Sequence, residues 1–135
     1  MATKKILCID DSINLLQVLK KRFGFDIPDA EVITTDNGED GLMLARREKP
    51  DVIILDINMP EMSGEEVLAQ LKHPTDLGEG ESSTKDIPVV VLTSRGPEEW
   101  AKFIKAGAAD YISSPFDMSE LVAKVKIIIS GKSSQ

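Results

Sequence analysis

Five short apolar runs, separated by stretches with helical periodicity, are the feature that most constrains the fold of this chain. Residues 6–9, 52–55 and 89–92 are continuously apolar, whereas residues 30–34 and 111–112 are mixed or shorter. Continuous apolar runs of this length are typical of strands buried on both faces of a parallel sheet. Alternating strands and helices are joined by right-handed crossovers, which place helices on both faces. We therefore predict an α/β fold with five parallel strands and five helices.

The predicted helices begin and end at residues with known capping preferences. Ser12 is expected to cap a helix that Gly24 closes, and Ser63 to cap a helix over residues 65–72. The other helices are predicted over residues 38–49, from Pro97 to Gly107, and from Asp117 or Ser119 onward. One stretch does not fit this alternation: residues 73–86 are polar and contain two glycines and a proline. They predict a long exposed loop, and residues 74–86 are expected to make little contact with the core.

Composition narrows the class of protein. The 135 residues fit one domain, with a core over about residues 3–130, and apolar residues make up 41% of the chain. The net charge of -7 argues against nucleic-acid binding and against a polybasic membrane anchor, because both need clustered cations. No stretch approaches the roughly 18 apolar residues of a membrane span. The one cysteine, Cys8, cannot form an internal disulfide. We expect a cytoplasmic protein.

Acidic and hydroxyl side chains follow three of the predicted strands. Asp10 and Asp11 come directly after the first apolar run, Asp56 after the third and Thr93 after the fourth. The carboxyl ends of parallel strands form one edge of the sheet, where ligands bind. Like charges 4 Å apart cost about 4 kcal/mol at an effective dielectric near 20. A hard cation such as Mg²⁺ relieves that repulsion, and a carboxylate beside it can act as a nucleophile towards phosphorus.

The order of these motifs resembles the receiver domains of bacterial response regulators, the signalling modules of two-component systems. The motifs are Asp10-Asp11, DINMP at residues 56–60 followed by Gly64, Thr93-Ser94, and GAADY at residues 107–111. The resemblance covers almost the whole chain. It implies a flavodoxin-like, doubly wound sheet with strand order 2-1-3-4-5, two helices on one face and three on the other.

The resemblance also implies roles for the acids. Asp10 and Asp11 would hold Mg²⁺ together with Asp56 and the backbone carbonyl of Asn58. Asp56 would accept a phosphoryl group from a sensor histidine kinase, a phosphotransfer protein or a small phosphodonor.

Two further residues would respond to the phosphoryl group, and two would shape the loop. Thr93 would donate its hydroxyl to the phosphate, and the rotamer of Tyr111 would follow phosphorylation. Alternatively, Tyr111 is only a half-buried aromatic residue at the edge of the sheet and has no switching role. Pro60 and Gly64 would shape the loop after Asp56.

Position 114 departs from the family pattern. The family places a lysine directly before the proline of this loop, and here Ser114 precedes Pro115. Serine offers a hydroxyl without charge. A charge-assisted hydrogen bond contributes about 1.5–3 kcal/mol against about 0.5–1.5 kcal/mol for a neutral one. Arg95, two residues beyond Thr93, either supplies the missing charge or faces solvent. We expect the peptide bond before Pro115 to be cis, as is usual in the family.

Three functions are compatible with these residues. The first is a Mg²⁺-dependent receiver in a phosphorelay, which signals to a downstream protein through a changed binding surface. The second is a degenerate receiver that acts as a largely phosphorylation-independent interaction module, which Ser114 favours. The third is a phosphatase-like enzyme with an aspartyl nucleophile. That class usually has a second aspartate two residues after the first, and Asn58 occupies this place. We therefore expect a signalling domain rather than an enzyme.

Overall fold

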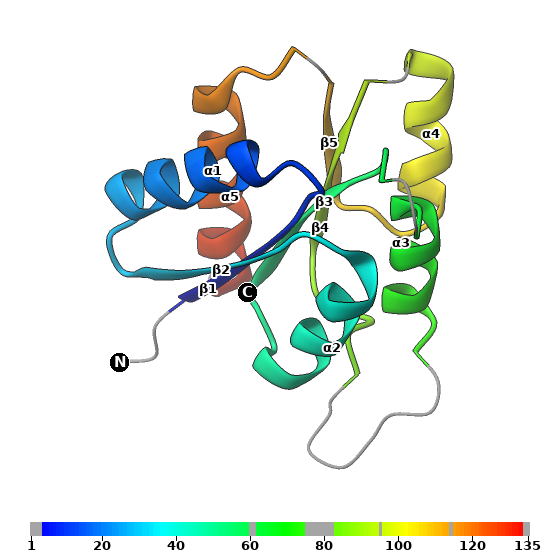
Figure 1. The fold of residues 1–135 in the computed structure, drawn as a ribbon, viewed down its shortest axis with the longest axis horizontal. Coiled ribbons are helices and arrows are strands. Elements are labelled where there is room, and N and C mark those ends of the chain that lie inside the picture. The colour runs from blue at the N-terminus through cyan, green and yellow to red at the C-terminus, as the bar shows by residue number, and fades with distance from the viewer. Residues whose placement is uncertain (1–3, 60–61, 75–82, 95, 114, 134–135) are drawn as a thin grey trace.

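The computed structural model describes residues 4–59, 62–74, 83–94, 96–113 and 115–133, and within them strands and helices alternate along the chain (Figure 1). The strands are β1 (Lys4–Ile9), β2 (Ala30–Thr35), β3 (Val52–Asp56), β4 (Val89–Thr93) and β5 (Asp110–Ser113). The helices are α1 (Ile13–Asp26), α2 (Gly38–Glu48), α3 (Gly64–Lys72), α4 (Pro97–Lys105) and α5 (Met118–Ser133). Every helix in this described part is too short or too polar to span a lipid bilayer.

The strands form one parallel sheet in the order β2-β1-β3-β4-β5, so the predicted fold class and strand order are confirmed. The chain passes from β1 outward to β2 and then returns across the sheet to β3. Strand order therefore reverses between β1 and β3, which are neighbours in the sheet. In open α/β sheets, ligands bind beyond the carboxyl ends of the strands at this point.

Two buried apolar clusters hold the helices against the sheet. On one face, α2, α3 and α4 pack through residues such as Leu42, Leu68 and Phe103. On the other face, α1 and α5 pack through residues such as Phe23 and Leu121 (Figure 1). The predicted division of two helices and three is confirmed. Because both faces are covered, residues 6–9, 52–55 and 89–92 of the three central strands are buried, which accounts for their continuous apolar runs.

Serine side chains cap two helices, as the sequence predicts. The hydroxyl of Ser12 accepts the backbone N–H of Leu15 at 3.2 Å at the beginning of α1. The hydroxyl of Ser63 accepts the N–H of Glu66 at 3.2 Å at the beginning of α3. Each serine satisfies one of the N–H groups that a helix start leaves without a partner.

The prediction that Gly24 closes the first helix is wrong. Helix α1 continues to Asp26, and Ile27 donates its backbone N–H to the carbonyl of Phe23 at 2.7 Å. The Phe23 side chain is fully buried, and Arg22 forms an ion pair of 2.6 Å with Asp26 in the last turn. These contacts outweigh the cost of about 1 kcal/mol for a glycine inside a helix.

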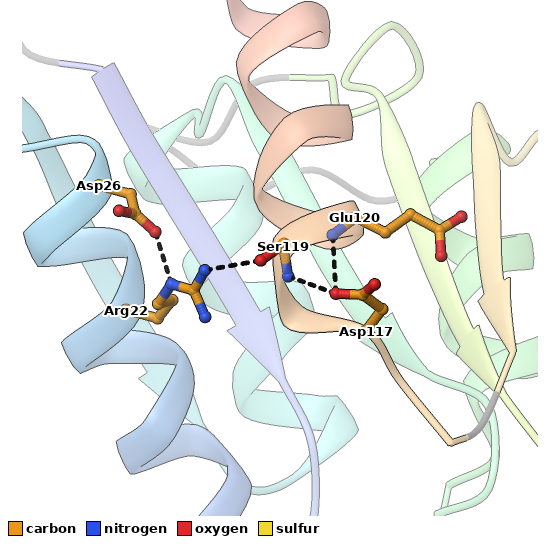
Figure 2. Close-up of polar contacts among 5 residues, drawn as sticks. All are labelled: Arg22, Asp26, Asp117, Ser119 and Glu120. Atoms are coloured by element: carbon orange, nitrogen blue, oxygen red, sulfur yellow. Dashed lines mark hydrogen bonds and ion pairs between the residues drawn. The ribbon is translucent and has the colours of Figure 1, made fainter.

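Arg22 also connects α1 to the beginning of α5. Its Nη2 donates to the hydroxyl of Ser119 at 3.0 Å (Figure 2). Asp117 Oδ1 accepts the N–H groups of Ser119 at 2.9 Å and Glu120 at 3.4 Å. Of the two residues predicted to open this helix, Asp117 is therefore the one that caps it.

The prediction that residues 74–86 have little contact with the core is wrong for the part of this segment that leads back to β4. Thr84 is 1% exposed, and its hydroxyl donates to the backbone carbonyl of Leu71 at 2.7 Å. The ammonium group of Lys72 donates to the backbone carbonyls of Lys85 at 2.9 Å and Ile87 at 2.6 Å. These hydrogen bonds fix the segment to the end of α3. Residues 75–82 lie outside the described residues.

Candidate functional site

Three neighbouring strands end at one edge of the sheet and bring the predicted site residues together. Asp56 is the last residue of β3, Thr93 is the last residue of β4, and Asp10 and Asp11 follow β1 directly. Because β3 lies between β1 and β4, these strand ends are adjacent. One carboxylate oxygen from each aspartate lies within 4.8 Å of those from the other two.

Local turns fix two of these carboxylates. Asp10 is 3% exposed, and its Oδ1 accepts the backbone N–H of Ser12 at 2.8 Å, just before α1 begins. Asp56 is partly buried, and its Oδ1 accepts the N–H of Asn58 at 3.0 Å. Asp11 is exposed. Backbone N–H groups therefore orient the carboxylates of Asp10 and Asp56, and solvent reaches the cluster at Asp11.

Burial and mutual repulsion disfavour the charged forms of these acids. Burial is the main cause that raises the pKa of Asp10 from 3.8 to about 7, the N–H of Ser12 opposes it, and the charges of Asp56 and Asp11 add to it. The pKa of Asp56 is also raised, again mainly by burial. The cluster therefore favours species that bring positive charge, either protons or a cation.

The donor set fits a magnesium ion. Mg²⁺ prefers oxygen ligands and usually keeps several waters while one or two carboxylates bind it. Here three aspartates present carboxylate oxygens within reach of one ion, and Asp11 is exposed to solvent. Among the described residues, no lysine or arginine forms an ion pair with any of the three. No described side chain therefore competes as a cation for these oxygens.

Thr93 and Tyr111 face the same side of the sheet. Tyr111 pairs in register with Val91, two residues before Thr93, and both strands are parallel. Side chains two residues apart on a strand point to the same face, so Thr93 shares the face of Val91. Tyr111 packs against the apolar cluster on that face, and Thr93 is 1% exposed. Both predicted switch residues therefore lie on the side of the sheet covered by α2, α3 and α4.

Ser94 is a residue for which the sequence motif implies no role. Asn58 Nδ2 donates to the hydroxyl of Ser94 at 2.9 Å. This bond joins the turn after β3 to the residue after β4, across the strand ends that carry the site. The only sequence signal for this contact is that Ser94 follows the end of a predicted strand.

Gly64 allows α3 to begin very close to the end of β3. A Cβ at this position would lie 2.5 Å from the Ile57 Cα and closer still to the carbonyl oxygen of Asp56. The Gly64 N–H donates to the carbonyl of Ile57 at 3.1 Å. No side chain larger than hydrogen fits there without moving the backbone of Asp56.

Pro60, Arg95 and Ser114 lie outside the described residues. The compensation of Ser114 by Arg95 and the cis bond before Pro115 therefore stay predictions.

Comparisons with known proteins agree with this architecture. The family model of the response regulator receiver domain matches residues 6–126. The chain is 37% identical over 131 residues to the alkaline phosphatase synthesis transcriptional regulatory protein PhoP of Bacillus subtilis, covering 93% of this chain and 48% of PhoP. It is 32% identical over 133 residues to protein PilH of Pseudomonas aeruginosa, covering 94% of this chain and 98% of PilH.

The similarity extends to solved structures. Chemotaxis protein CheY4 of Vibrio cholerae superposes with a TM-score of 0.77 at 29% identity, covering 94% of this chain and 99% of CheY4. The chain spans about half the length of several curated relatives, including PhoP at 48% and PrrA of Mycobacterium bovis at 53%. The likeness to those proteins therefore concerns one part of each.

Proposed function

Since this chain belongs to the response regulator receiver domain family, we propose that it accepts a phosphoryl group on Asp56 and signals through a changed surface. The observation that supports this most directly is the convergence of three aspartate carboxylates within 4.8 Å of one another at adjacent strand ends. The donor would be a sensor histidine kinase, a phosphotransfer protein or a small acyl phosphate. The reader of the signal would be a downstream protein.

Asp56 would be the nucleophile. One of its carboxylate oxygens attacks the donor's phosphorus, so a P–O bond to Asp56 forms while the donor's P–N or P–O bond breaks. The leaving group keeps the electron pair of that bond. The hydroxyl of Thr93, at the end of the neighbouring strand, would donate a hydrogen bond to a phosphoryl oxygen. The chemistry would end with a modified aspartate, which fits a signalling domain rather than an enzyme.

The metal would be held by residues that surround Asp56. Asp10, Asp11 and Asp56 offer carboxylates, and the backbone carbonyl of Asn58 is the fourth proposed ligand. Mg²⁺ bound there would neutralise charge that develops on the phosphoryl oxygens. Asp10 would be the most rigid of these ligands, because it is buried and bonded to the N–H of Ser12.

We also propose that residues 1–135 form a single receiver domain. Both apolar clusters pack on one sheet, which supports this assignment. A cytoplasmic location goes with the proposal, because phosphodonors of this kind derive from ATP inside the cell.

The direct test is incubation with acetyl phosphate and Mg²⁺, followed by intact mass measurement. We expect one added phosphoryl group on the wild-type chain, and none on Asp56→Asn or when the metal is removed by a chelator. Asp56→Asn retains an acceptor for the N–H of Asn58, so its fold should be preserved. Equal labelling of Asp56→Asn and wild type would contradict the assignment of Asp56.

Ser114 and Arg95 can be tested together in the same assay. If Arg95 supplies the charge that Ser114 lacks, Arg95→Ala should weaken the affinity for a beryllofluoride mimic about tenfold, equivalent to about 1.4 kcal/mol. Ser114→Lys should then rescue Arg95→Ala while adding less to the wild type. A double-mutant cycle measures this coupling. No effect of Arg95→Ala, with a gain from Ser114→Lys alone, would reject the compensation.

A further inference from the structure

Asn58 is an exposed residue that is held from several sides. Its backbone N–H donates to Asp56 Oδ1 at 3.0 Å, and its side-chain amide donates to the hydroxyl of Ser94 at 2.9 Å. Its neighbours in the chain, Ile57 and Met59, are 1% and 8% exposed. Asn58 is thus anchored by two buried neighbours, by the end of β3 and by the residue that follows β4.

These anchors restrict the backbone of Asn58. The bond to Asp56 fixes the position of its N–H, and the burial of Met59 fixes the chain that follows its carbonyl. Without the bond to Ser94, the Asn58 side chain would be free in solvent and the turn would have more accessible conformations. The hydroxyl of Ser94 therefore removes conformational freedom that metal binding would otherwise have to remove.

We propose that Ser94 is a positioning residue for the metal site: it holds Asn58 so that the carbonyl of Asn58 is preorganised as a Mg²⁺ ligand. This inference rests on the proposed function, because it takes the metal site at Asp10, Asp11 and Asp56 as given. Ser94 itself does not bind the ion. It acts through Asn58, and it also ties together the two strand-end turns that border the site.

The test is the affinity of the metal alone, measured by calorimetric titration of the chain with Mg²⁺. The net contribution of one exposed hydrogen bond corresponds to a change in affinity of about three- to tenfold. Ser94→Ala should weaken Mg²⁺ binding by this factor, and Ser94→Thr, which keeps a hydroxyl, should restore most of it. Asn58→Ala keeps the backbone carbonyl and should weaken binding similarly. The double variant Ser94→Ala/Asn58→Ala should be no weaker than Asn58→Ala.

Ser119→Ala is the matched control, because it removes another exposed serine hydroxyl that bonds to a side chain, Arg22, on α1. It should leave Mg²⁺ affinity unchanged. Unchanged Mg²⁺ affinity in Ser94→Ala, or additive losses in the double variant, would overturn the positioning role of Ser94. If Asp11→Ala still weakens Mg²⁺ binding in that case, the metal site itself stands. A wild-type chain whose Mg²⁺ binding is absent or insensitive to Asp11→Ala would overturn the metal site itself, and this inference with it.

Discussion

The indole ring of Trp100 stacks on the phenol ring of Tyr111, with ring centroids 4.6 Å apart and an angle of 25° between the planes. Trp100 lies on α4 and Tyr111 on β5, so the stack joins a helix to the edge strand of the sheet. Aromatic pairs of this kind contribute about 0.5–1.5 kcal/mol beyond their burial. A movement of Tyr111 would therefore have to break or rebuild this contact.

Trp100 is the only tryptophan, which makes this contact measurable. If Tyr111 changes rotamer on phosphorylation, beryllofluoride with Mg²⁺ should shift the tryptophan emission of the wild-type chain. The shift should vanish in Asp56→Asn, which cannot bind the mimic productively, and should be reduced in Tyr111→Leu. An unshifted wild type that binds the mimic would show that Tyr111 keeps its stacked position.

The pKa of Asp10 predicts an unusual dependence of stability on pH. Its folded pKa of about 7 lies above the ordinary value of 3.8. Between about pH 4 and pH 7, the folded state keeps a proton that the unfolded chain has released, so stability falls as pH rises through this window. The loss should amount to about 2–4 kcal/mol in metal-free buffer.

Urea unfolding at pH 5 and pH 8 checks this prediction. Asp10→Asn should flatten the difference, because asparagine does not titrate but can still accept the N–H of Ser12. Millimolar Mg²⁺ should restore stability at pH 8 in the wild type, since it binds the folded state preferentially, but not in Asp11→Ala. Equal pH dependence in Asp10→Asn and wild type would assign the effect to other groups.

The arrangement of the site could be predicted because it follows from chain order. Alternating strands and helices fix a parallel sheet, and residues placed just after the strands must then share an edge. That reasoning located Asp10, Asp56 and Thr93 correctly at neighbouring strand ends. It could not find the contact of Asn58 with Ser94, because this bond depends on the relative height of two turns that are 36 residues apart in sequence.

Both wrong predictions concern contacts that the local preference of a residue type does not reveal. Gly24 has the local preference of a helix end, but buried Phe23 and the Arg22–Asp26 ion pair keep the helix going. Thr84 lies in a polar stretch, and polarity alone does not distinguish a solvated hydroxyl from a buried one with a partner. At Gly24, the burial of Phe23 and the Arg22–Asp26 pair outweigh a local cost of about 1 kcal/mol for a glycine inside a helix.

Thr84 should matter for stability even though it follows a polar segment. Thr84→Val keeps the size of the side chain but leaves the carbonyl of Leu71 without its hydrogen bond at 2.7 Å. An unsatisfied buried polar group costs about 1–3 kcal/mol, so unfolding by urea should show a loss of that size. Lys85→Ala is the control, because the exposed Lys85 contributes a backbone carbonyl that the substitution retains. Equal stability of Thr84→Val and wild type would mean that water replaces the hydroxyl.

The last prediction compares two glycines that the structure places in opposite situations. At Gly64 an added methyl would lie 2.5 Å from the Ile57 Cα, so Gly64→Ala must displace backbone and should cost about 2 kcal/mol or more. At Gly24, inside α1, an added methyl would meet no atom of another element within 4 Å, so Gly24→Ala should stabilise by about 0.5–1 kcal/mol. Urea unfolding of both variants measures the change in the free energy of unfolding, which should be a loss for Gly64→Ala and a gain for Gly24→Ala.

The two variants should also differ in their rate of phosphorylation. Because Gly64 contacts the backbone of Asp56, its displacement should slow labelling by acetyl phosphate even at temperatures where Gly64→Ala stays folded. Gly24→Ala should be labelled at the wild-type rate, since Gly24 lies in the last turn of α1, at the opposite end of this helix from Asp10 and Asp11. Normal labelling of a folded Gly64→Ala variant would show that the start of α3 can move without moving Asp56.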